Sequence, residues 1–271
     1  MWALEHDVPA APTDVPVVAR VPALILVGTV ALALVLAGGG YLPAGDVRAV
    51  LVAALHGALL TAALGAAAGA SRAWTVTTPA IITLALIAVG AVASRIHAHG
   101  SLAYLAVLAW LSWLGVRGQL APLGVRPTSM IALLVGSLAG VVLGSHVLLS
   151  ATFTLGYRLR DDGVAAWLLA LAYDVGLNIP SAELFVRGVV FDGLQRRVSF
   201  ATGAAVATLA YLARFLPDPR LPSAVEVLAG ATIYLTLLSA INSWLFWWSG
   251  SLLPGLASAL AFFAAYRLLG T

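Results

Sequence analysis

Glu183 and Arg187 are the residues whose types and spacing point most directly to chemistry. They stand four positions apart in an apolar stretch, residues 180–197. On a helix this spacing places both side chains on one face, where the carboxylate and the guanidinium can pair. Because charges are costly among apolar side chains unless they pair, we treat these two as a candidate functional site. A proline at the start is typical of a first helical turn, so we predict that one helix covers residues 180–197, beginning at Pro180.

Asp174 and Asn178 form a second polar pair at the same four-residue spacing, just before this stretch. Two interpretations stay open. Asp174 could line a polar cavity beside Glu183, or it could cap a helix end or approach the membrane interface near Pro180, where we expect a break in the helix.

The composition of the chain is typical of a membrane protein. Of its 271 residues, 62% are hydrophobic and only 9% are charged, whereas soluble domains carry about a quarter charged residues. We therefore predict an all-α, polytopic transmembrane helical bundle. The net charge of +3 is small, and the arginines lie between apolar runs, which is typical of loop charges and not of a nucleic-acid patch. With no Cys, disulfides, thiolate metal sites and a Cys nucleophile are excluded; no metal site and no cofactor are expected.

The apolar runs divide the chain into three parts. We predict a short disordered tail over residues 1–20, N-terminal transmembrane helices over 21–120, and a transmembrane core over 121–271. About eight to nine spans are expected, because residues 164–177 and 180–197 could be one broken span or two. Of the other runs, the second one ends near residue 70. The rest cover about 21–37, 76–94, 102–116, 130–155, 201–216, 224–248 and 252–269.

Two of these runs carry glycines at four-residue spacing, which lets helix backbones approach closely. Gly65 and Gly69 form one such pair, and Gly136, Gly140 and Gly144 form a longer row. We expect each row to pack against another helix.

Three stretches resemble the CPBP family (CAAX proteases and bacteriocin-processing enzymes). The family's first motif, Glu-Glu-x-x-x-Arg-Gly, is similar to Ala182-Glu-Leu-Phe-Val-Arg-Gly188. Residues 122–127 lead into a Gly-rich span as in the family, and residues 251–260 resemble its final motif. The likeness covers roughly residues 121–269. It implies a CAAX-protease-like core that hydrolyses a peptide bond within the membrane. In the family, the first Glu and a second-motif His activate water, and a His and an Asn of the last motif hold the oxyanion.

This chain departs from the family at each of those four positions. Ala182 replaces the first Glu, Arg214 the second-motif His, and Phe262 the Asn; Ser258 replaces the last His if one residue is missing from the spacing. Arg214 stays protonated and cannot act as a base, and Ser258 can donate a hydrogen bond but cannot activate water. Glu183 points about 100° away from Ala182 on the helix.

The motif residues that this chain retains suit a packing role, whereas the family residues that it has lost would do the chemistry. This favours a catalytically degenerate pseudoprotease that binds a membrane peptide or partner without cutting it. One alternative is an active intramembrane peptidase with a rearranged site, because a carboxylate such as Glu183 or Asp174 can serve as a base in an apolar site. Another is a transporter or channel subunit on an unrelated bundle, although no repeated half is visible. The expected surroundings are the lipid bilayer of the bacterial cytoplasmic membrane, with a membrane protein or lipidated peptide as partner and no nucleic acid.

Overall fold

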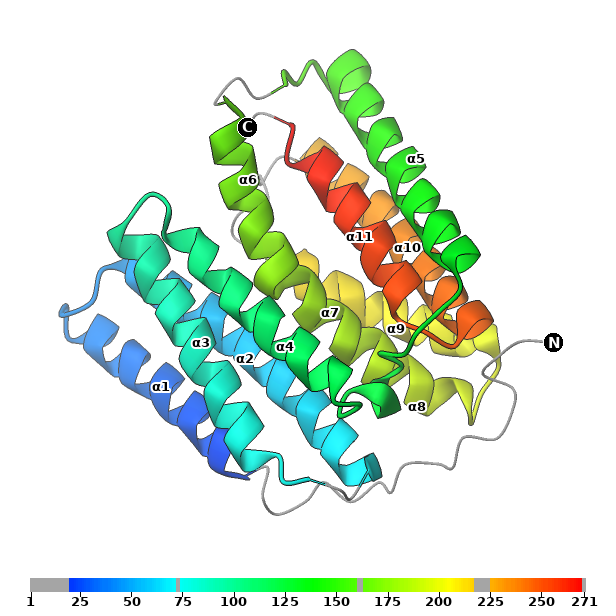
Figure 1. The fold of residues 1–271 in the computed structure, drawn as a ribbon. Coiled ribbons are helices and arrows are strands. Elements are labelled where there is room, and N and C mark those ends of the chain that lie inside the picture. Colours follow the sequence, from blue (N-terminus) through cyan, green and yellow to red (C-terminus); the bar gives the residue numbers. More distant parts are fainter. Residues whose placement is uncertain (1–19, 72–73, 160–162, 217–224, 270–271) are drawn as a thin grey trace.

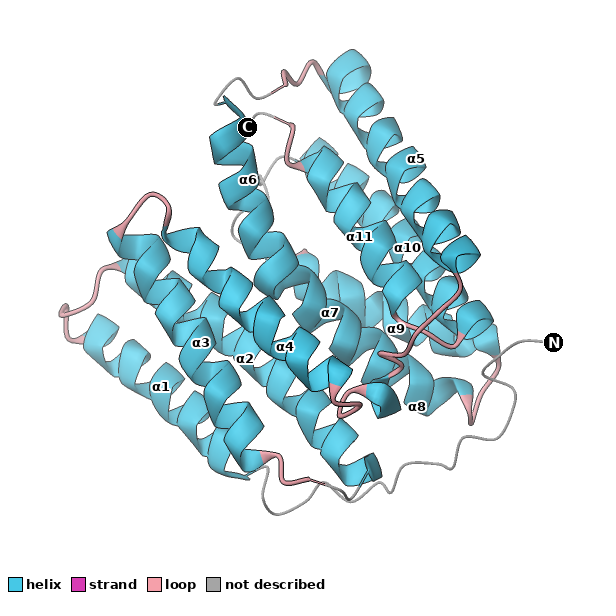
Figure 2. Ribbon diagram, in the orientation of Figure 1, coloured by secondary structure: helices cyan, strands magenta, loops and turns pink. Residues whose placement is uncertain are grey.

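The computed structural model describes residues 20–71, 74–159, 163–216 and 225–269, and these residues fold almost entirely into helices (Figures 1 and 2). The predicted tail, residues 1–20, lies outside the described residues except for its last one. The helices are α1 (Arg20–Gly38), α2 (Ala44–Ser71), α3 (Thr77–Ile96), α4 (Leu105–Val116), α5 (Met130–Leu155), α6 (Gly163–Tyr173), α7 (Ile179–Phe185), α8 (Asp192–Gln195), α9 (Phe200–Phe215), α10 (Val225–Ser249) and α11 (Leu253–Tyr266).

The lengths of these helices suit a bilayer, whose apolar core needs about 20 residues of helix. Within the described part of the chain, five helices are long and apolar enough to cross it: α2, α3, α5, α10 and the continuous helix that contains α6, α7 and α8. Shorter apolar helices, α1, α4, α9 and α11, lie beside them. The prediction of an all-α membrane bundle is confirmed.

The central helix runs without a break from Gly163 to Gln195, so the prediction that a helix begins at Pro180 is wrong. Two π-helical segments, Asp174–Asn178 and Val186–Phe191, join α6, α7 and α8. In the first, the Ile179 amide donates to the carbonyl of Asp174, five residues back. This wider turn comes directly before Pro180, which has no amide hydrogen. A π-bulge is one way in which a helix accommodates a missing backbone hydrogen bond.

The central helix lies between two groups of helices (Figure 1). Helices α1–α4 gather on one side of it, and α5, α10 and α11 on the other. Helix α2 contacts α7 directly, α9 contacts the second π-helical segment, and α11 also reaches α7. The central helix is therefore covered by both the predicted N-terminal helices and the predicted core.

The glycine row of α5 packs against α11, as the sequence predicts. A Cβ atom added at Gly136 would lie 2.2 Å from the carbonyl oxygen of Pro254, and one added at Gly140 would lie 2.1 Å from that of Ser258. The two backbones therefore approach too closely for a side chain. At Gly65, by contrast, an added Cβ would meet no heavy atom within 4 Å, so this glycine does not mediate a close helix contact.

Gly140→Ala should destabilise the protein, because its new methyl group would overlap a backbone carbonyl that cannot move freely. Overpacking of this kind costs about 1–3 kcal/mol. The measurement is the thermal unfolding of the purified protein in detergent. Gly65→Ala is the matched control, and it should be neutral or slightly stabilising because alanine favours a helix. Equal losses in both variants would contradict the close α5–α11 contact.

Candidate functional site

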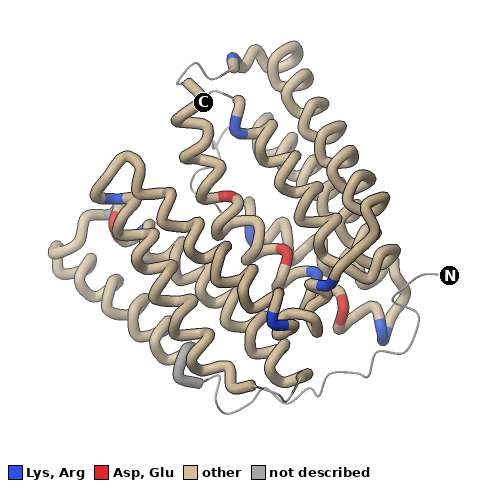
Figure 3. Tube along the Cα trace, in the orientation of Figure 1, with Lys and Arg blue, Asp and Glu red and all other residues tan. Residues whose placement is uncertain are grey.

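Charged residues are sparse in this fold, and some lie along the middle of the bundle (Figure 3). The central helix buries five polar side chains that are 0–3% exposed. They belong to two clusters, which we call the Glu183 cluster and the Asp174 network. The Glu183 cluster contains Glu183, Arg187, Thr208, Tyr211, Ser239 and Asn242; the Asp174 network contains His56, Tyr173, Asp174, Asn178, Ser181, Arg214 and Arg267.

The Glu183 cluster is built around the predicted ion pair. Arg187 Nε lies 3.4 Å from Glu183 Oε2, with both side chains buried. Asn242 of α10 donates from Nδ2 to Glu183 Oε1 at 3.0 Å. Arg187 donates from Nη2 to the Ser239 carbonyl at 2.9 Å, and its guanidinium lies 4.3 Å from the centre of the Tyr211 ring. The pair is thus supported by α9 and α10, as a buried charge pair requires.

Part of the hydrogen-bonding capacity of this cluster is not met by the described protein groups. Glu183 Oε2, Arg187 Nε and Nη1, and Asn242 Oδ1 are buried and make no hydrogen bond there. The hydroxyl of Ser258 on α11 is also buried and makes no hydrogen bond to the described residues. Acceptors and donors therefore remain on residues of the cluster and on Ser258.

The Asp174 network starts from a carboxylate that is fully enclosed. Arg267, just after α11, donates from Nε to Asp174 Oδ2 at 2.6 Å and from Nη2 to Oδ1 at 2.9 Å. Asn178 also donates to Oδ1, at 3.0 Å. This two-bond contact between a guanidinium and a carboxylate is the strong form of the pair. Asp174 thus lies inside the protein, tied to the end of α11.

The network continues through Asn178 to α9 and α2. Arg214 donates from Nη2 to Asn178 Oδ1 at 2.7 Å, and the same nitrogen lies 3.0 Å from His56 Nε2. His56 also contacts the Tyr173 hydroxyl and the Ser181 hydroxyl, each at 2.7 Å. Four separate segments of the chain therefore meet in one hydrogen-bonded group.

The structure brings some of the predicted site residues together and keeps others apart. Asp174, Asn178 and Arg214 share one network, whereas Glu183 and Arg187 form the other. Ala182 is fully buried, as is Ser258. Ser258 lies one turn after Gly255, whose added Cβ would lie 3.5 Å from Asn242 Cβ.

Phe262 supplies no polar group to either cluster. Its ring lies edge-on to Phe263, which stacks on Phe215, the neighbour of Arg214. An apolar contact therefore stands where the family resemblance implies a carboxamide.

Sequence reasoning did not assign eight residues of these clusters to the site: His56, Tyr173, Ser181, Thr208, Tyr211, Ser239, Asn242 and Arg267. A signal existed for two of them. His56 is the one titratable residue in the interior of the second apolar run, and Asn242 follows Ser239 at three-residue spacing in the run before the last. A polar residue within an apolar membrane helix most often faces another helix.

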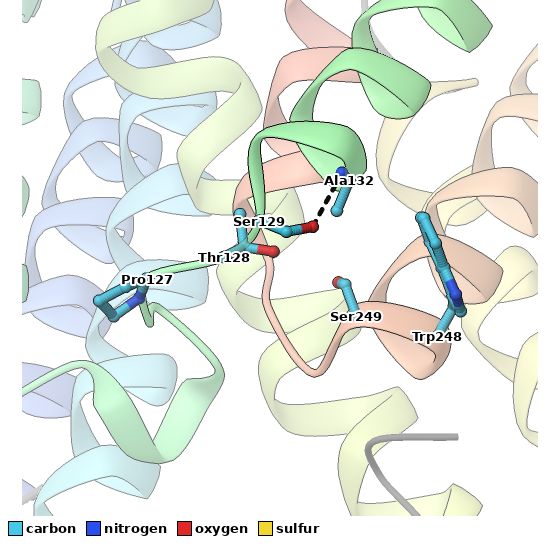
Figure 4. Close-up of a pocket in the computed structure, with 6 residues that line it drawn as sticks. All are labelled: Pro127, Thr128, Ser129, Ala132, Trp248 and Ser249. Carbon is cyan, nitrogen blue, oxygen red and sulfur yellow. Dashed lines mark hydrogen bonds between the residues drawn. The ribbon is translucent and has the colours of Figure 1, made fainter. Parts of the chain in front are cut away.

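A separate pocket of about 470 Å³ lies between the start of α5 and the end of α10. Figure 4 shows Ser129 at the start of α5, accepting a hydrogen bond from the Ala132 amide, and Trp248 across the opening. None of its lining residues belongs to the two clusters: Pro127, Thr128, Ser129, Ala132, Trp248 and Ser249.

Comparison with protein families gives a match over part of the chain. Residues 164–262, from the central helix into α11, match the family model described as type II CAAX prenyl endopeptidase Rce1-like. The match confirms the predicted resemblance to the CPBP family over this segment. Neither the comparison with curated proteins nor that with solved structures found a match.

Proposed function

We propose that this CAAX-protease-like membrane protein is a catalytically degenerate member of its family, which binds a membrane peptide or a partner helix without cutting it. The proposal rests on one observation. The four positions to which the resemblance assigns catalysis hold Ala182, Arg214, Ser258 and Phe262, and all four are at most 6% exposed. We place the protein in the bacterial cytoplasmic membrane, with a membrane protein or a lipidated peptide as its partner.

The chemistry that these positions offer supports the proposal. Peptide hydrolysis needs a base that activates water and donors that hold the oxyanion, each of which contributes orders of magnitude in rate. Ala182 carries no functional group, and Arg214 remains charged. Arg214 is also engaged by His56 and Asn178 inside the protein. Of the two oxyanion positions, only Ser258 has a donor.

Purified protein in liposomes should therefore not cleave prenylated CAAX-type peptides or signal-derived peptides. The measurement is product formation followed by mass spectrometry, with and without a chelator, and the chelator should make no difference. Glu183→Gln is the negative control, and both it and the parent should form product only at the background level. The positive test is the combined variant Ala182→Glu, Arg214→His, Ser258→His and Phe262→Asn, which restores the family residues.

A second candidate function is an active peptidase with a rearranged site, and the unmet hydrogen bonds around Glu183 favour it. Glu183 Oε2, which is paired with Arg187, and Asn242 Oδ1 accept no hydrogen bond from the described residues. A carboxylate held in an apolar site can act as a general base. Turnover by the parent that disappears in folded Glu183→Gln would establish this function and refute the pseudoprotease.

Binding without cleavage can be measured directly. A prenylated peptide carrying a fluorophore should bind the parent in liposomes and remain intact after prolonged incubation. Failure of any membrane peptide to bind would remove the support for a peptide-binding role.

A further inference from the structure

His56 is a fully buried imidazole whose two ring nitrogens both have protein partners. Its Nδ1 lies 2.7 Å from the Ser181 hydroxyl. Its Nε2 lies 2.7 Å from the Tyr173 hydroxyl and 3.0 Å from Arg214 Nη2. The side chain reaches from α2 to the central helix and to α9, so residues of these two helices decide which ring nitrogen carries hydrogen.

The hydrogen-bond partners define which nitrogen carries the hydrogen. A guanidinium has donors and no acceptor, and it is not deprotonated in proteins. Nε2 must therefore accept from Arg214, which leaves the hydrogen of a neutral imidazole on Nδ1. Protonating Nε2 as well would place two donors and two positive charges against each other.

The opposite side of the ring agrees with this assignment. Ser181 Oγ lies 3.0 Å from the Asn178 carbonyl and donates to it. The Ser181 hydroxyl has one hydrogen, so it is left to accept from His56 Nδ1–H. Asp174, the carboxylate of the same network, is bound by Arg267 and Asn178.

We propose that Arg214 fixes His56 as a neutral imidazole in the Nδ1–H tautomer, so that its one basic nitrogen is permanently engaged. This inference rests on the proposed function and deepens it. Arg214 stands where the resemblance implies an imidazole, and α2 returns an imidazole to the same region from outside the matched segment. The guanidinium then occupies the nitrogen that would otherwise accept a proton from water. Arg214 thus replaces the family's base and also prevents His56 from acting as one.

Nitrogen NMR of the whole protein tests the tautomer without any cleavage assay. The protein is labelled with ¹⁵N-histidine in nanodiscs at neutral pH, and the His56 signals are assigned as those that disappear in His56→Gln. The chain has five His, so the assignment is tractable. We expect His56 in the parent to show a protonated Nδ1 and an unprotonated Nε2.

Two variants separate the effect of Arg214 from that of Tyr173. Tyr173→Phe removes a hydroxyl and leaves the guanidinium, so the Nδ1–H tautomer should persist. Arg214→Leu removes the guanidinium, so a population with hydrogen on Nε2 should appear. If Arg214→Leu does not fold, Tyr173→Phe still tests the proposal: loss of the Nδ1–H tautomer there would assign it to Tyr173 and overturn the proposal.

Other outcomes also decide the matter. An Nε2–H tautomer or an imidazolium in the parent would overturn the proposal, as would an unchanged tautomer in folded Arg214→Leu. Peptide turnover by a parent whose His56 shows the expected tautomer would refute the proposed function and leave this assignment intact. The two ideas therefore fail by different results.

Discussion

Arg187→Ala should remove most of the folded protein from the membrane, because it leaves the Glu183 carboxylate in a site that is 1% exposed. Breaking a buried ion pair by removing one partner costs about 3–5 kcal/mol, a large fraction of the stability of an ordinary protein. Arg187 also holds the Ser239 carbonyl and covers the Tyr211 ring, and these contacts would be lost as well. The measurement is the yield of monodisperse protein in detergent, followed by thermal unfolding.

The C-terminal end of the same helix offers a matched control for this variant. Arg196 pairs with Asp192 at the same four-residue spacing, but its side chain is 24% exposed and that of Asp192 is 15% exposed. A pair that solvent reaches is screened and contributes about 0–1 kcal/mol, so Arg196→Ala should cost much less than Arg187→Ala. Equal effects of the two variants would show that burial does not govern the Glu183–Arg187 pair.

Removing both charges distinguishes the loss of the ion pair from the cost of leaving one buried charge unpaired. Glu183→Leu combined with Arg187→Met should accumulate better than Arg187→Ala alone, since apolar residues often replace buried ion pairs without loss. If the double variant is no better than the single one, the contribution of the cluster comes from shape and not from charge.

Much of this fold could be predicted from the sequence, because the strongest signals in a membrane chain are local. The fifth apolar run, residues 130–155, coincides with α5, and its glycine row does pack against another helix. The Glu183–Arg187 contact follows from four-residue spacing on one helix. The continuity of the central helix through Pro180 could not be predicted, because proline usually marks a boundary and a π-helical turn has no clear sequence signature.

The partners of the site residues were beyond sequence reasoning for a different reason. His56 lies 158 residues from Arg214, and Asn242 lies 59 residues from Glu183. Such contacts depend on which helix faces are adjacent in the bundle, and a single apolar sequence does not contain that information. The sequence thus located most of the buried polar residues of the central helix but not their partners on the other helices.

Arg267→Leu should also be severely destabilising, although the residue lies just after the last helix. Its partner Asp174 has a side chain that is 0% exposed, and Arg267 supplies two of its three hydrogen bonds. Without the guanidinium, Asn178 is the one donor that the described residues leave to the carboxylate, and an unpaired buried charge costs about 3–5 kcal/mol. Loss of the contact should also release the end of α11 from the central helix. The measurement is again yield and thermal unfolding in detergent.

Three further variants show whether this effect comes from the charge, the geometry or the position. Arg267→Lys keeps the charge but loses the planar fork that makes two parallel bonds, so it should be intermediate between the parent and Arg267→Leu. Asp174→Asn combined with Arg267→Leu removes the stranded charge and should recover part of the stability. Arg95→Leu breaks an exposed pair with Asp46 between α2 and α3, with side chains 53% and 35% exposed, and should change little. A fully buried carboxylate that loses its cation should lower the unfolding temperature strongly. If Arg267→Leu unfolds at the same temperature as Arg95→Leu, the Asp174–Arg267 contact does not hold α11 to the central helix.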